Sequence, residues 1–155
     1  MPTLDYLHGL FHYNYWANQE SLDSVSAVEQ QPKRAIEVLA HIAGAELLWL
    51  ERLLEIPQTA VVWPDLSLLE VNTAFDDLNQ RWMSYLSALD ANALCESVDY
   101  VNSLGEPWRN TRQDMLMHVV VHSSYHRGQV AIVLGLVGHK SAYTDLIHGV
   151  RQQLF

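Results

Sequence analysis

Residues 117–129 read MHVVVHSSYHRGQ, a stretch that places three histidines four residues apart inside an otherwise apolar run. They are His118, His122 and His126, which form two overlapping H-x-x-x-H pairs. On an α-helix each residue advances by about 100°, so side chains four positions apart stack on one face, one turn above the other. Two such imidazoles can bind one metal ion.

The position of the apolar face favours His122 and His126 as the metal-binding pair. Both lie within about 40° of Met115 on a helical projection, whereas His118 lies about 60° to one side. Two imidazoles buried without partners would each cost about 1–3 kcal/mol, and a shared metal ion offsets both costs. We therefore predict that this pair binds a metal ion. The alternative is that both are core histidines with ordinary hydrogen-bond partners.

The composition is that of a compact globular chain. Charged residues make up 17% and apolar residues 49% of the 155 positions, which excludes a disordered chain. This length is typical of one domain with a sizeable core, so we expect a single domain over residues 1–155. The net charge is −9 and the nine basic residues are scattered, so no nucleic-acid partner is expected.

The single cysteine restricts which side chains can bind a metal, and the absence of long apolar runs bears on where in the cell the protein is expected. Cys95 alone provides no internal disulfide and no cluster of thiolate ligands, so a metal ion would be held by histidines. No run reaches about 18 apolar residues, and the first residues lack the pattern of a secretory signal. We expect a cytoplasmic protein that does not bind membranes.

Apolar residues recur at three- and four-residue spacing in four long segments. Thr3 is a candidate N-cap, Ser67 with Glu70 and Thr111 with Asp114 have the spacing of capping boxes, and a proline at position 32 suits a first helical turn. We predict helices over residues 3–26, 32–55, 67–89 and 111–137, and the segment from Tyr143 to Leu154 is a candidate for a short terminal helix.

Two other segments interrupt the helical pattern. The stretch from Pro57 to Pro64 is too broken for a helix and long enough to cross the end or the side of a bundle. Between residues 90 and 110, alternation at Val98 and Tyr100 followed by a glycine turn predicts a small hairpin. The expected fold is all-α, a four-helix bundle with a long crossover from the second to the third helix and a hairpin-like insertion before the fourth.

Three further histidines lie in the expected helices, and one of them is a candidate ligand. His41 lies at the edge of the apolar arc of the helix expected over residues 32–55, and the small Ala45 one turn later suits a ligand and ordinary packing equally well. His8 and His12 form another H-x-x-x-H pair, but they project off the apolar stripe of their helix. We therefore expect His8 and His12 to face solvent.

Signatures of other enzyme classes are absent from the sequence. It contains no E-x-x-H or H-E-x-x-H, no Walker loop or G-x-G-x-x-G, and no nucleophile elbow. No general acid or base can be identified, because Asp114 is a candidate helix cap and Glu46 lies about 140° around its helix from His41. The catalytic residues therefore stay unassigned.

Three strings resemble the DinB family: YNYWAN at residues 13–18, HIAGAELLWLERL at 41–53 and MHVVVHSSYHRGQ at 117–129. The resemblance extends over nearly the whole chain, and Y-H-R-G-Q is its most specific part. It implies a four-helix bundle with a long crossover. It also implies a metal site with one histidine from the second helix and a pair from the fourth, which here are His41, His122 and His126.

Three neutral imidazoles leave a metal ion with open positions, as in catalytic sites. Imidazole binds several divalent transition metals, and zinc or nickel is expected here. Such a centre acts as a Lewis acid and lowers the pKa of bound water or a bound thiol. Because the ligands must be deprotonated, metal affinity is expected to fall below about pH 6.5.

The resemblance also implies two classes of function. Relatives in the wider superfamily include transferases and isomerases that use low-molecular-weight thiols, so one hypothesis is a metal-dependent transferase or hydrolase with a small-molecule substrate. The other is a non-catalytic metal-binding bundle. A bundle without metal is a third and weaker reading.

Other polar and aromatic residues are candidates for supporting roles. Gln129 and His118 lie near the proposed pair, where they either orient ligands or substrate or form hydrogen bonds within the bundle. Asn14 and Asn18 are candidates to line the cavity from the first helix. Trp16 is also a candidate, although plain packing is the expected role for an aromatic residue at helical spacing.

The face of the fourth helix opposite the histidines carries small residues within about 40° of one line. They are Ser124, Gly128, Ala131 and Gly135, with Val120 and Val121 beside them. Such a stripe lets another helix approach closely, so we predict a homodimer through this face. The alternative is that the crossover or the C-terminal segment of the same chain covers it.

Overall fold

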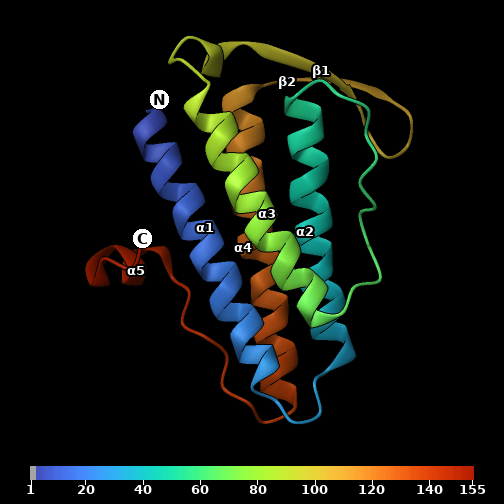
Figure 1. Ribbon diagram of the computed structural model, residues 1–155, viewed down its shortest axis with the longest axis vertical. Helices are drawn as coiled ribbons and strands as arrows, with labels where there is room; N and C mark the ends of the chain where they lie inside the picture. Colours follow the sequence, from blue (N-terminus) through green and yellow to red (C-terminus); the bar gives the residue numbers. More distant parts are fainter. Residues whose placement is uncertain (1–2) are drawn as a thin grey trace.

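The computed structural model describes residues 3–155, and within them four long helices lie alongside one another (Figure 1). These are α1 (Leu4–Ser26), α2 (Lys33–Leu53), α3 (Leu68–Ser87) and α4 (Arg112–Leu136). A short 3₁₀ helix, η1 (Ala93–Cys95), and the strands β1 (Ser97–Val101) and β2 (Pro107–Thr111) precede α4, and α5 (Leu146–Gln152) follows it. The prediction of a mostly helical fold with a small hairpin is confirmed.

Side-chain caps explain where three of the long helices begin. The Thr3 and Thr111 hydroxyls accept backbone N–H bonds from the first turns of α1 and α4, at 3.2 and 3.3 Å. Ser67 and Glu70 form a complete capping box at the start of α3, in which each side chain bonds the other residue's backbone N–H. These bonds satisfy amide groups that have no partner within a helix, so the starts follow from local sequence.

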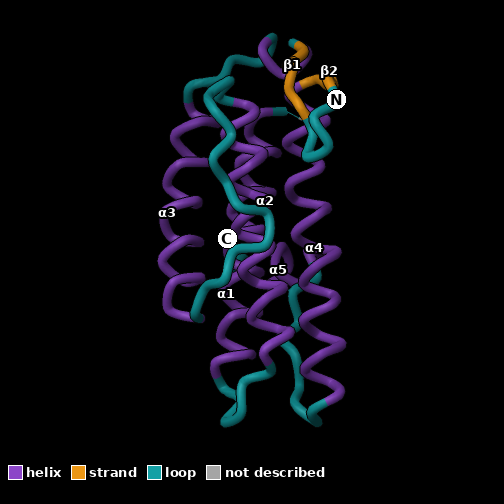
Figure 2. The backbone as a smooth tube through the Cα atoms, turned by 90° about the vertical axis from the view of Figure 1, so that its right-hand side faces the viewer, coloured by secondary structure: helices purple, strands orange, loops and turns teal. Residues whose placement is uncertain are grey.

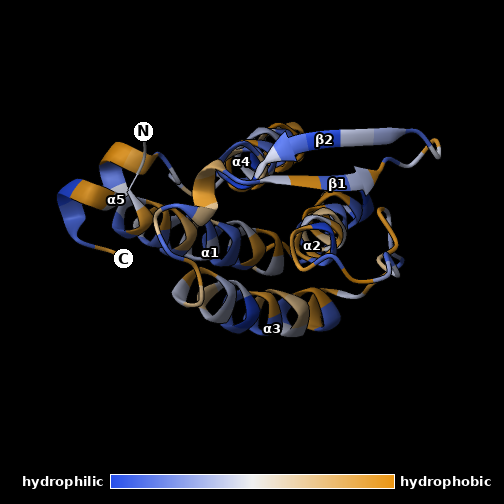
Figure 3. Ribbon diagram, turned by 90° about the horizontal axis from the view of Figure 1, so that it is seen from above, coloured by the Kyte–Doolittle hydropathy of each residue, from blue (hydrophilic) through white to orange (hydrophobic). Residues whose placement is uncertain are grey.

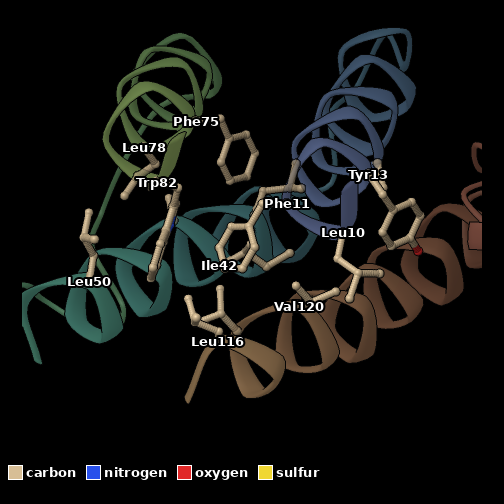
Figure 4. Packing of buried hydrophobic residues seen from close by; sticks show 14 of the residues in the cluster. Leu10, Phe11, Tyr13, Ile42, Leu50, Phe75, Leu78, Trp82, Leu116 and Val120 are labelled. Carbon is tan, nitrogen blue, oxygen red and sulfur yellow. The ribbon is translucent and has the colours of Figure 1, made fainter. Parts of the chain in front are cut away.

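The core lies where all four long helices meet (Figure 4). Phe11 of α1 contacts Trp82 of α3, with ring centroids 4.8 Å apart, and Ile42 of α2 and Leu116 of α4 are fully buried beside them. Burying such side chains contributes about 1.5–3 kcal/mol each relative to leaving them exposed. This shared core sets the spacing between α2 and α4, the two helices that carry the candidate ligands.

Residues 54–67 connect α2 to α3 and run along the outside of α2 (Figures 1 and 2). The crossover backbone lies very close to the helix at Gly44. A Cβ atom there would overlap the Val61 carbonyl oxygen and lie 3.0 Å from the Val62 carbonyl oxygen and from Pro64 Cδ. Only glycine therefore permits this contact between the crossover and α2.

The hairpin pairs Tyr100 with Trp108 and lies across the ends of α2 and α4 (Figure 3). Val98 and Tyr100 of β1 lie on the face turned toward the helices, whereas Asp99 and Arg109 lie on the outer face and form an exposed ion pair at 3.7 Å. The hairpin therefore covers the end of the molecule where α4 begins.

The small-residue stripe of α4 is largely exposed. Among the described residues outside the helix itself, nothing lies within 4 Å of a Cβ placed on Gly128 or Gly135. Residues 141–147 form the opposite wall of a cavity of about 510 Å³ that Gly128 and Ala131 also line. The C-terminal segment thus runs beside the stripe without packing tightly on it, and the homodimer stays a prediction. None of the helices within residues 3–155 has the length and apolar character needed to cross a membrane.

The close approach at Gly44 leads to a stability prediction. Gly44→Ala should lower the free energy of unfolding by about 1–3 kcal/mol, because the added methyl group must displace the crossover backbone. Gly9→Ala is the matched control, since nothing lies within 4 Å of a Cβ at that helical position. There the change should be neutral or stabilising by up to about 1 kcal/mol. Urea unfolding of both variants measures the difference, and equal stability would contradict the close approach.

Candidate metal centre

Three histidines from two helices form one group. His41 of α2 and His122 and His126 of α4 each place a ring nitrogen so that the three atoms lie within 4.8 Å of one another. The closest pair is His41 Nε2 and His126 Nε2, 3.1 Å apart. Two nitrogen ligands of one tetrahedral zinc ion, each at about 2.0–2.1 Å from the metal, would lie about 3.3 Å apart. The spacing of this pair therefore suits a shared ion.

Hydrogen bonds to the other ring nitrogens set the orientation of two of these imidazoles. His41 Nδ1–H donates to the Val62 carbonyl oxygen at 2.7 Å, and His126 Nδ1–H donates to Gln129 Oε1 at 3.1 Å. A neutral imidazole carries only one N–H, so in both rings Nε2 holds a lone pair. Two lone pairs facing each other at 3.1 Å repel, and a cation between them removes that repulsion.

Aromatic side chains surround the group. Trp63 of the crossover stacks on the His41 ring at a centroid distance of 3.9 Å and an interplanar angle of 10°. Tyr125 lies edge-on to His126 at 5.1 Å. Both aromatic side chains are also exposed to solvent, Trp63 to 48% and Tyr125 to 67%, so they cover the histidines only in part.

Burial and electrostatic repulsion favour the neutral form of His41 and His122. Burial lowers the pKa of His41, although the bond to Val62 opposes that effect. The pKa of His122 is lowered to about 4, first by burial and then by the nearby positive charge that His126, His41 and His118 would carry if protonated. His122 therefore stays neutral well below pH 6.5, which narrows the pH range in which protons compete with a metal for this ligand.

His118 lies beside the group and not in it. Its ring packs against Trp49 at 4.6 Å and lies 5.4 Å from His122. Burial, and then the charge of Arg52, lower its pKa. His12 is exposed and His8 is half-buried, and neither belongs to the group of three. Ligation by the group itself stays a prediction.

A buried polar cluster that sequence reasoning missed lies among α1, α2 and α4. Glu46 Oε1 accepts hydrogen bonds from Asn14, Asn18 and Ser123 at 2.7–2.9 Å. Arg127 Nη1 donates to the side-chain oxygens of Asn14 and Asn18 at 2.8 and 2.7 Å. Burial raises the pKa of Glu46, and these bonds oppose the rise.

This cluster changes the interpretation of the first helix. Asn14 and Asn18 were candidates to line the metal cavity, and in the structure their amides join Glu46 to Arg127. Trp16 packs near Phe155, at a centroid distance of 5.9 Å, in agreement with a packing role. Two asparagines one turn apart on a buried face were the available signal, because buried amides need polar partners.

The sequence is similar to a known protein family and to a protein from Bacillus subtilis. The model of the DinB family matches residues 5–153, which include all three histidines of the group. The chain is also 25% identical over 159 residues to a protein described as Protein DinB from Bacillus subtilis (strain 168), and this alignment covers 91% of each chain.

The lowered pKa of His122 predicts a pH dependence of the metal-free protein. An unfolded histidine has a pKa of about 6.5, so below this pH the unfolded chain binds a proton that the folded chain does not bind until about pH 4. Stability is therefore lost as the pH falls from about 6.5 to 4.

His122→Gln should lose less stability than the wild type over this window, because glutamine does not titrate. Thermal unfolding of both chelator-treated proteins between pH 7 and pH 4 measures the difference, and an NMR titration gives the pKa directly. A measured His122 pKa near 6.5 would contradict the burial of this ring among the other histidines.

Proposed function

Because the chain belongs to the DinB family, we propose that it binds one divalent transition-metal ion through His41, His122 and His126. The observation that carries the proposal is the pair of Nε2 atoms 3.1 Å apart, whose partner nitrogens are already bonded to Val62 and Gln129. The proposal includes the finer fold assignment, a single DinB-type four-helix bundle.

Zinc or nickel is the proposed metal, because imidazole nitrogens bind both. A bound ion would supply Lewis acidity and favour the deprotonated form of a water or thiol. Val62 and Gln129 orient His41 and His126 through their hydrogen bonds, as carbonyl partners of metal-binding histidines commonly do. Trp63 covers His41 from the crossover side.

The proposed activity is that of a metal-dependent transferase or hydrolase acting on a small molecule, with a low-molecular-weight thiol as the candidate co-substrate. Three protein ligands leave coordination positions for substrate, which favours this activity over a purely structural site. The alternative is a non-catalytic metal-binding protein. It is favoured by the position of Glu46, because hydrogen bonds from Asn14, Asn18 and Ser123 hold this buried carboxylate within the helix core.

Metal content is the first test. Purified protein should contain about one divalent ion per chain, and replacing His41, His122 or His126 with alanine should weaken metal binding at least about 10–100-fold, the range seen even for lost supporting contacts. His118→Ala is the matched control, since this ring lies beside the group, and it should leave metal content unchanged. Loss of metal in that variant alone would show that the ligands are wrongly assigned.

Activity distinguishes the two candidate functions. A screen of low-molecular-weight thiols with electrophilic substrates should show turnover that chelation abolishes and zinc or nickel restores. Full metal occupancy without turnover would favour the non-catalytic protein.

The proposed assembly is a cytoplasmic homodimer formed through Ser124, Gly128, Ala131 and Gly135. It is supported by the exposure of Gly128 and by the open space around its Cα and that of Gly135. Sedimentation should give a dimer at micromolar concentration, and Gly128→Leu should give a folded monomer because the leucine side chain would hold the partner helix away. A wild-type monomer would exclude this assembly.

A further inference from the structure

A second cavity lies between the hairpin and the ends of α2 and α4. Its volume is about 540 Å³, within the usual range of small-molecule sites. Arg52, Trp49, Tyr100 and Trp108 line it, with polar groups from Asn102 and Asn110 among others. The exposed carboxylate of Asp114 also lines the cavity, where it accepts a hydrogen bond from the Thr111 hydroxyl at 2.6 Å. Aromatic walls with a few polar groups are typical of pockets that bind small organic molecules.

Arg52 is a buried cation without a matching anion. Its side chain is only 6% exposed, and no carboxylate in residues 3–155 forms an ion pair with it. Its Nε–H donates to the Gln58 side-chain oxygen at 3.0 Å and its Nη2–H to the Val101 carbonyl oxygen at 3.3 Å, both of them neutral acceptors. Burying a charge without a counter-charge is costly, so an anion in the cavity would stabilise it.

Two aromatic rings hold the guanidinium in place. Its central carbon lies 4.6 Å from the ring centre of Trp49 and 4.7 Å from that of Tyr100. Cation–π contacts compensate part of the lost hydration without neutralising the charge. The planar group is therefore preorganised on the cavity wall, and its fork geometry matches carboxylates and phosphates.

The same cavity adjoins the three-histidine group. Val62, whose carbonyl binds His41, lines it, and so does His118, which lies 5.4 Å from His122. We propose that this cavity binds a small organic anion with a flat apolar body, held by Arg52 at its charged end and extending toward the histidines. The claim that this anion is a substrate rests on the proposed metal centre. Binding of the anion requires only the cavity.

The test compares two probes that differ mainly in charge. Phenylacetate and phenylacetamide are titrated into the chelator-treated protein, followed by the fluorescence of the tryptophans that line the cavity. Phenylacetate should bind at least about tenfold more tightly, since hydrogen bonds to a charged group contribute about 1.5–3 kcal/mol. Equal affinities in the wild type would overturn the proposal.

Two variants test the role of the buried charge. Arg52→Gln should abolish the preference for phenylacetate. Asn110→Asp tests the proposal independently if Arg52→Gln does not fold. The aspartate keeps an acceptor for the Tyr100 hydroxyl, which donates to Asn110 at 2.8 Å. It also adds a carboxylate to the cavity. It should weaken phenylacetate binding about tenfold. If a folded Arg52→Gln variant or the Asn110→Asp variant still prefers phenylacetate as strongly as the wild type does, the proposal is overturned.

Arg109→Gln is the matched control, because it removes a positive charge from the outer face of the same hairpin. This variant should prefer phenylacetate over phenylacetamide as strongly as the wild type does. If it loses this preference as fully as Arg52→Gln, phenylacetate binding depends on general surface charge and not on Arg52. Working without metal separates the two ideas. If phenylacetate binding depends on Arg52 but the protein takes up no metal, the cavity assignment stands and the metal centre is refuted. If the protein takes up metal but phenylacetate binding does not depend on Arg52, the metal centre stands and the cavity assignment is refuted.

Discussion

The hydrogen bond from His41 Nδ1 to the Val62 carbonyl oxygen connects the crossover to the candidate metal centre. It commits the proton of His41 to one side of the ring and leaves Nε2 facing His126. The contact exists because the crossover lies directly on α2, and the crossover can come this close because Gly44 has no side chain. The positions of Trp63 over His41 and of Val62 in the second cavity follow from the same close approach.

The two buried arginines differ in how their charge is compensated. Arg127 is linked to Glu46 through the amides of Asn14 and Asn18, so a carboxylate and a guanidinium share one buried network. Arg52 has aromatic rings and neutral oxygens instead. A network that joins opposite charges fixes the packing of helices, whereas an uncompensated charge beside a cavity provides binding energy for an anion.

The chain belongs to the DinB family, and three of its histidines lie close enough to one another to hold one metal ion. The histidines offer ring nitrogens as ligands, whereas Glu46 Oε1 accepts three hydrogen bonds within the helix core. Proton transfer in a reaction at this centre would therefore depend on a metal-bound water or thiol, or on His118, more than on a buried acid.

The amino-acid sequence by itself determined the long helices, the hairpin and the pairing of His122 with His126. These features depend on caps, on periodicity and on residues one turn apart, which are local interactions. Helical projection also set His118 to one side, and the structure agrees. The family resemblance, not the periodicity, selected His41.

Only the tertiary structure decided which distant groups meet. The approach of His41 to His126, the Val62 carbonyl bond, the link between Glu46 and Arg127 and the position of Arg52 under the hairpin all join separate elements. Glu46 was set aside on the sequence because it points away from His41 around α2, yet that direction leads into the space between α1 and α4. A helical projection describes one helix at a time, and the partner of a buried polar group depends on how several helices pack together.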